Sequence, residues 1–186
     1  MLTIFEKILI SALACIVIVN IAFQIYIRLP DDEMREENIL TVFYDDKKWG
    51  YALSELQDID EYSGIGSMMT QFTIKGPYNF TGVRFSELFQ GLDIDEGAMG
   101  VWIIAADGYN KTFTYDELQG NISVFDESGN NSGIPVELLL VYSQNGDVLN
   151  SDDGPLRLAY VGQSNCVTLS SYWIKQVKEI IFFNER

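Results

Sequence analysis

The stretch from Ile8 to Ile27 contains twenty consecutive residues without a charged side chain, and it constrains this chain more than any other feature. At about 1.5 Å of rise per residue, a helix of this length covers roughly 30 Å, the hydrocarbon thickness of a bilayer. A cleaved secretory signal is the alternative, but its apolar region usually has only about 7–15 residues. Cleavage at the weak lipoprotein-type site before Cys15 would leave an apolar tail on the mature chain. We therefore predict an uncleaved signal anchor.

The charges beside this stretch predict its orientation. Lys7 precedes it, whereas Arg28 is soon followed by Asp31, Asp32 and Glu33. Because cationic residues favour the cytoplasmic side, we expect the N-terminus inside and the remaining chain outside the cell membrane. The predicted organisation is a cytoplasmic N-terminus at 1–7, a single transmembrane helix at 8–27, an acidic linker at 28–38 and one folded domain at 39–186.

Two further features belong to this exported arrangement. Asn20 and Gln24 are one helical turn apart and therefore share a face, which either contacts a partner helix or meets water near the outer interface. Four N-x-Ser/Thr sequons predict a possible glycoprotein. Their asparagines are Asn79, Asn110, Asn121 and Asn130.

The composition excludes several functions. The chain has 12 Lys plus Arg against 27 Asp plus Glu and no histidine, which gives a formal charge of −15. Such a surface repels phosphate backbones, so no nucleic acid is expected as a partner. Without histidine, the chain lacks the commonest general base and metal ligand. Cys15 lies in the apolar stretch and Cys166 in the domain, so we expect no disulfide within the domain and a buried, apolar role for Cys166.

Short apolar and β-branched runs bounded by Gly, Pro, Asn or Asp predict strands in the domain. These runs are 39–44, 68–74, 101–106, 111–114, 136–142, 156–161 and 177–183. Short helices are predicted at 54–59, 84–91 and 114–119, with Ser54 and Ser86 as N-caps. Trp102 and Trp173 are expected in the core. The predicted class is α+β, with mostly antiparallel strands in mixed sheets and short peripheral helices.

Motifs for common chemistries are incomplete or absent. Asp93 and Asp95 begin a pattern like a calcium loop, but its twelfth position is Ile104 rather than a glutamate, so the EF-hand interpretation fails. A nucleophilic serine would need lysine or a carboxylate as its base, and the sequence contains no G-x-S-x-G or S-x-x-K context. No phosphate-binding glycine loop is present either.

The order of several segments is more informative than any one of them. They read Phe80-Thr-Gly-Val-Arg-Phe-Ser-Glu-Leu-Phe, then Ala106-Asp-Gly-Tyr, then Gly154-Pro-Leu-Arg-Leu and finally Val177-Lys-Glu-Ile. In this order they resemble the oxidoreductase molybdopterin-binding domain of the sulfite oxidase family, over roughly residues 39–183. The resemblance implies a sulfite-oxidase-like molybdopterin-binding fold and, in the family, a molybdenum cofactor ligated by a cysteine.

The chain departs from the family at that ligand. Counted along the family pattern, the ligating cysteine falls at about Thr70, and the sequence has no cysteine between Cys15 and Cys166. A threonine hydroxyl cannot replace a soft thiolate with comparable affinity. The negative electrostatic potential of the acidic domain also disfavours binding of an anionic pterin. We therefore expect no cofactor and no metal, and keep molybdopterin as the alternative.

The resemblance nevertheless marks a vestigial cofactor cleft. Its residues would be Thr70, Asp107, Tyr109 and Arg157. Asp107 and Tyr109 have a structural alternative, an Asx-type turn with Gly108 at positive φ and Tyr109 as an aromatic cover. Arg157 should project opposite to its apolar strand neighbours, where it either pairs with a carboxylate beside the cleft or lines a solvated face.

The expected function is that of a membrane-anchored, extracytoplasmic and non-catalytic binding or interaction module with a degenerate molybdopterin-binding fold. Its partner would be an unknown small ligand in the cleft or another protein. Two alternatives remain open. One is a divergent molybdopterin-dependent oxidoreductase. The other is a structural subunit of a membrane or surface assembly, since Glu6 before an apolar helix is loosely pilin-like, although the charged break at Asp31 argues against a long pilin helix.

Overall fold

The computed structural model describes residues 36–184 except residue 91 and residues 93–98. The predicted anchor at 8–27, with Asn20 and Gln24, and the calcium-like Asp93 and Asp95 therefore lie outside the described residues. Within the described part, no helix has the length and apolar character needed to cross a bilayer.

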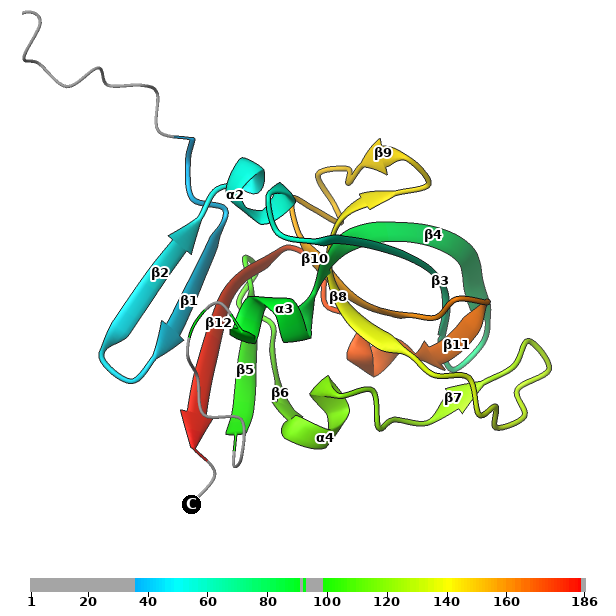
Figure 1. Cartoon of the computed structure of the whole chain (residues 1–186). Helices are drawn as coiled ribbons and strands as arrows, with labels where there is room; N and C mark the ends of the chain where they lie inside the picture. Colours follow the sequence, from blue (N-terminus) through cyan, green and yellow to red (C-terminus); the bar gives the residue numbers. More distant parts are fainter. Residues whose placement is uncertain (1–35, 91, 93–98, 185–186) are drawn as a thin grey trace, which may run out of the picture. The chain divides into compact units, whose positions relative to one another are not determined.

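One five-stranded sheet has the order β2-β1-β12-β5-β6 and occupies the left of Figure 1. Its strands are β1 (Leu40–Tyr44), β2 (Lys47–Tyr51), β5 (Met99–Ala105), β6 (Asn110–Thr114) and β12 (Val177–Asn184). The β1–β12 pair is parallel and the other pairs are antiparallel. Alternate side chains such as Val42, Ile103 and Ile180 are fully buried, so one face of the sheet covers the core.

The second sheet has the order β10-β8-β4-β3-β11-β7, and β9 pairs with β8. Its strands are β3 (Glu61–Met69), β4 (Ile74–Arg84), β7 (Val124–Phe125), β8 (Glu137–Gln144), β9 (Asp147–Val148), β10 (Arg157–Val161) and β11 (Cys166–Leu169). Strands β3 and β11 are parallel, and the remaining pairs are antiparallel. The mixed, mostly antiparallel sheets agree with the predicted α+β class.

The described helices are short and lie at strand ends: α2 (Leu53–Gln57), α3 (Phe85–Gln90), α4 (Tyr115–Leu118) and the 3₁₀ turn η2 (Ser170–Tyr172). The three predicted helices correspond to α2, α3 and α4. The Ser54 cap is wrong, because Ala52 holds the N-cap position and its amide donates to the Glu55 carboxylate at 2.8 Å. Ser86 lies inside α3 rather than before it.

The domain has two apolar clusters that meet at β10. One contains the inner side chains of the five-stranded sheet together with Leu158 and Tyr160. The other lies on the opposite face of β10 and contains Ala159, Phe80 and Trp173. Trp173 is thus in the core as predicted, whereas the same prediction for Trp102 is wrong, since this side chain is 46% exposed on the outer face of β5.

Most predicted strands coincide with observed ones, and the exception is informative. The predicted strand at 68–74 is wrong, because β3 ends at Met69 and β4 begins at Ile74, so these residues form a hairpin tip. Strands β2, β7, β9 and β11 and most of β3 and β4 were not predicted, since their sequences lack a continuous apolar run. In the Phe-Thr-Gly-Val motif, Gly82 is required because a Cβ atom there would collide with the Leu140 carbonyl of β8.

Candidate functional site

Arg157 is the one charged residue buried in the described core, and its surroundings form the candidate site. It begins β10 and projects toward the second apolar cluster, opposite to Leu158, as expected from the strand alternation. Its guanidinium carbon lies 5.5 Å from the Phe80 ring centroid and 5.3 Å from the Trp173 ring centroid. Two aromatic rings therefore hold the guanidinium within an apolar setting.

A carboxylate neutralises this buried charge. The Arg157 Nη1 atom donates to Asp153 Oδ1 at 3.2 Å and more weakly to Gln144 Oε1 at 3.4 Å. Lys175 Nζ also donates to Asp153 Oδ1, at 2.7 Å, and Asn150 Nδ2 donates to Asp153 Oδ2 at 3.1 Å. Arg157 Nε is buried and has no hydrogen-bond partner within the described part of the chain.

This environment lowers the pKa of both ionised partners, Arg157 and Asp153. Burial lowers the pKa of Arg157, although the Asp153 charge opposes the effect. Burial alone would raise the pKa of Asp153, but the Lys175 hydrogen bond and the charges of Arg157 and Lys175 outweigh it, so that pKa is lowered. Asp153 therefore stays ionised to a lower pH than an ordinary aspartate.

A surface hollow of about 290 Å³ lies beside this network, at the β8–β9 hairpin. It is lined by Gln144, Asn145, Asp147, Val148, Leu149 and Asn150. Two of these residues also belong to the buried network, since Gln144 accepts from Arg157 and Asn150 donates to Asp153. The walls of the hollow are therefore mainly amide and carboxylate groups.

Asp107 and Tyr109 lie in the β5–β6 turn of the other sheet. The Tyr109 amide donates to Asp107 Oδ1 at 2.9 Å, and Gly108 has φ of 87°, so the predicted Asx-type turn is present. Tyr109 is 51% exposed and does not act as the expected aromatic cover. Two backbone hydrogen bonds connect the turn to the Arg157 network, one from the Ala106 amide to the Gln176 carbonyl and one from the Gln176 amide to the Asp153 carbonyl.

Thr70 is engaged in the tip of the β3–β4 hairpin. Its hydroxyl donates to the Thr73 carbonyl at 2.9 Å and accepts from the Thr73 amide at 3.1 Å, and the Thr70 amide donates to the same carbonyl at 2.8 Å. These bonds close a four-residue turn and occupy the hydroxyl oxygen. None of the described contacts joins Thr70 to Asp107, Tyr109 or Arg157.

The one described thiol does not suit a metal. Cys166 is buried, its Sγ lies 3.4 Å from the Ile65 carbonyl, and burial raises the pKa of the thiol to about 11. Thiolate ligation needs the deprotonated sulfur. The residues described here, Thr70 and Cys166 included, therefore do not fit the thiolate-ligated molybdenum that the resemblance implies, whereas the buried, apolar role predicted for Cys166 is confirmed.

Sequence reasoning found Arg157 but missed its partners. Asp153, Gln144 and Lys175 come from a loop, a strand end and the segment before β12, and no spacing in the sequence links them. The only available signal was the rule that an arginine within an apolar strand needs a carboxylate. The four predicted cleft residues are not gathered into one cleft by the described contacts, and a cofactor role for them stays a prediction.

Comparison with known proteins gives a likeness of fold. No protein-family model matches the sequence, and no curated protein matches it. The crystal structure of the sulfane dehydrogenase SoxCD from Paracoccus pantotrophus is similar, with a TM-score of 0.54 and 14% sequence identity. The match covers 78% of this chain but only 38% of that chain. At this identity the similarity shows the fold alone, and it supports a distant sulfite-oxidase-like molybdopterin-binding fold.

Proposed function

We propose that this protein is a binding module that uses a sulfite-oxidase-like fold without a molybdenum centre. The observation that carries the proposal is the bonding of the Thr70 hydroxyl, since the resemblance places the family's thiolate at about this residue. Its hydroxyl is committed to the hairpin turn, and Cys166, the cysteine of the domain, is buried and protonated at neutral pH. The polar hollow beside Arg157 is the proposed site for a small ligand.

Elemental analysis tests the absence of a metal centre. The full chain is expressed with molybdate and, separately, with tungstate, and the purified protein is analysed for both metals. We expect neither metal at stoichiometric level while the circular dichroism spectrum shows a folded protein. Stoichiometric metal would overturn the proposal, and a parallel Cys166→Ala variant would show whether the thiol holds it.

The second candidate is a divergent molybdopterin-dependent oxidoreductase. Its support is the structural similarity to a sulfane dehydrogenase, a protein whose name states a redox activity. This candidate requires a cofactor held without the family's thiolate. Fluorescence of the oxidised pterin released by acid would detect such a cofactor, and its absence from folded protein would eliminate the candidate.

We also propose that residues 8–27 anchor the module in the cell membrane with the domain outside. Its support is the uncharged apolar stretch and the cationic residue before it. All four sequon asparagines are exposed in the described domain, so glycosylation is sterically permitted. Alkaline carbonate extraction of membranes from expressing cells should leave the chain in the pellet, and external protease should digest the domain in intact cells. Release by carbonate would refute the anchor.

A further inference from the structure

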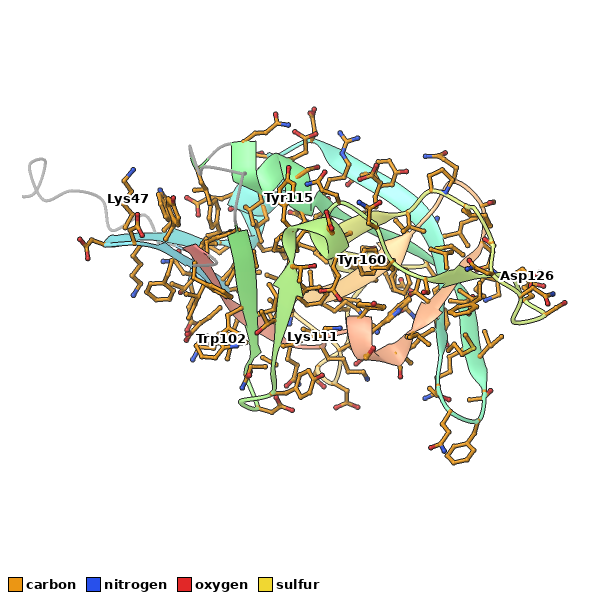
Figure 2. All side chains as sticks on the ribbon, turned by 90° about the horizontal axis from the view of Figure 1, so that it is seen from below. Lys47, Trp102, Lys111, Tyr115, Asp126 and Tyr160 are labelled. Atoms are coloured by element: carbon orange, nitrogen blue, oxygen red, sulfur yellow. The ribbon has the colours of Figure 1, made fainter. Side chains whose placement is uncertain are left out.

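Four of the five large apolar side chains that are exposed in the described domain lie toward one side of it, and Val148 is the exception. Phe72 is 88% exposed at the β3–β4 tip, and Trp102 is 46% exposed on β5. Tyr109 is 51% exposed in the β5–β6 turn, and Leu169 is 38% exposed at the end of β11. We call these four residues the apolar side. None of them belongs to either core cluster. In Figure 2, the β3–β4 tip and the β5–β6 turn lie at the lower margin of the view, and the labelled Trp102 lies beside β5 above that turn.

Contacts between the two sheets join these positions. Leu169 pairs with Met69 beside the hairpin tip, and η2 follows β11 directly. Lys111 of β6 donates to the Ser171 carbonyl at 2.9 Å, and its ammonium lies 3.9 Å from the Tyr172 ring centroid. The inner face of β6 is thereby held against η2. Trp102 pairs with Thr112 and projects from the outer face of the same hairpin, so the apolar side reaches from the hairpin tip through β11 and η2 to the β5–β6 hairpin and continues on its outer face at Trp102.

The segments that build this side carry one carboxylate, Asp107 of the β5–β6 turn, although the chain has 27 acidic residues. They are 67–76, 99–114 and 166–178, and they carry Lys75, Lys111, Lys175 and Lys178. Asp153 and Glu179 pair with Lys175 and Lys178. A surface that combines exposed aromatic residues with lysines suits the headgroup region of a phospholipid bilayer.

The chain length also places a bilayer within reach. Twelve residues separate Ile27, the end of the apolar stretch, from Leu40 at the start of β1. Even fully extended, they reach only about 40 Å. This step rests on the proposed anchor, which would keep the domain close to the lipid surface.

We propose that the apolar side rests on the surface of a phospholipid bilayer, with Phe72, Trp102 and Leu169 entering the headgroup region. A lipid surface can receive separate protrusions such as a hairpin tip and a turn. A protein partner or a second copy would instead need a continuous, closely packed contact. Contact with lipid would orient the domain and leave the β8–β9 hollow accessible to a soluble ligand.

Quenching of tryptophan fluorescence by brominated lipid tests the proposal. The full chain is reconstituted in nanodiscs of phosphatidylcholine and phosphatidylglycerol, with and without bromine on the acyl chains. We expect bromine-dependent quenching of the wild-type protein and loss of most of it in Trp102→Phe, because Trp173 is buried and Trp49 packs against the core. A Phe72→Ser, Leu169→Ser double variant should also be quenched less, because it weakens the contact.

Val148→Ser provides the matched control. Val148 is 75% exposed on β9, outside the apolar side, so its loss should leave quenching unchanged. Unchanged urea unfolding midpoints would show that the variants are folded. Equal fluorescence in brominated and plain nanodiscs would overturn the proposal, as would Trp102 protection that depends on protein concentration, which would indicate a second copy. Carbonate extraction reports the anchor separately, so its failure is distinguishable from failure of the lipid contact.

Discussion

At the scale of single residues, Arg157 explains most about the candidate site. Its side chain is 6% exposed, its guanidinium lies against two aromatic rings, and it shares one carboxylate with Lys175. A buried ion pair rarely adds much net stability, but removal of one partner leaves an uncompensated charge. Arg157 thus fixes the loop that carries Asp153 against the wall of the hollow.

Replacement of Arg157 should therefore lower the stability of the domain. We expect Arg157→Met to lower the free energy of unfolding by roughly 3 kcal/mol, because Asp153 loses its buried partner. The matched variant Lys175→Met removes a half-exposed partner of the same carboxylate and should cost less than about 1 kcal/mol. Urea unfolding followed by circular dichroism measures both values. Equal costs would show that burial of Arg157 does not matter to the pair.

The lowered pKa of Asp153 predicts a pH dependence. Because the folded carboxyl binds its proton only at a lower pH than the unfolded one, its contribution to stability is present above the ordinary pKa of 3.8 and is lost as the pH falls through the lowered value. The difference in unfolding free energy between wild type and Asp153→Asn should be greatest at pH 7 and narrow below pH 3.8. Urea titrations across this range measure it. A difference that widens in acid would contradict the ion pair.

At the scale of elements, the β3–β4 hairpin departs most from its sequence pattern. The run from Met68 to Ile74 is apolar and β-branched, yet the chain reverses within it. Thr70 makes the reversal possible, because its hydroxyl replaces backbone partners that the tip residues cannot find in the sheet. The turn at Thr70, near which the resemblance would place a ligating cysteine, is a structural turn with Phe72 exposed at its end.

Removal of the Thr70 hydroxyl should loosen this tip. We expect Thr70→Ala to cost about 1 kcal/mol, as for the loss of a typical hydrogen bond. Amide hydrogen exchange at Phe72 and Thr73 should become faster, while exchange in β10 stays unchanged. Gln71→Ala, in the same exposed turn, is the control and should leave these rates unaltered. Unchanged exchange in Thr70→Ala would mean that the backbone alone holds the turn.

At the scale of the whole molecule, the domain depends on two apolar clusters that share β10, a strand buried along its full length. No disulfide is available to it, since its one described cysteine is free and buried. Cys166 belongs to the larger cluster and contacts the carbonyls of Ile65 and Tyr160. Its exposure to reagent should therefore report global unfolding.

Thiol labelling tests this dependence. Burial raises the pKa of Cys166 to about 11, so the native thiol should react with iodoacetamide far more slowly than the urea-unfolded thiol at pH 8. Mass spectrometry of the Cys166 peptide measures the two rates and separates them from Cys15. The native rate should rise with urea in parallel with the unfolding transition. Rapid labelling in the native state would contradict the buried position.

Patterns among neighbouring residues were enough to predict many of the strands and turns of the fold. The runs at 101–106 and 156–161 predicted β5 and β10, and the Asp107-Gly108-Tyr109 motif predicted its turn, because strand alternation and turn chemistry depend on neighbouring residues. The motif order also anticipated the sulfite-oxidase-like fold that the structural similarity supports. Edge strand β2 escaped prediction because an edge needs no continuous apolar run.

The sequence by itself determined the uncharged stretch at 8–27, the acidic charge, the absence of histidine and the absence of a cysteine near Thr70. Only the tertiary structure decided that Trp102 is exposed, that Thr70 closes a hairpin, and that Arg157 meets Asp153 and Lys175. The physical reason is the separation along the sequence of the residues that interact. Composition and local spacing are properties of the chain, whereas burial and charge pairing arise when segments distant in sequence pack together.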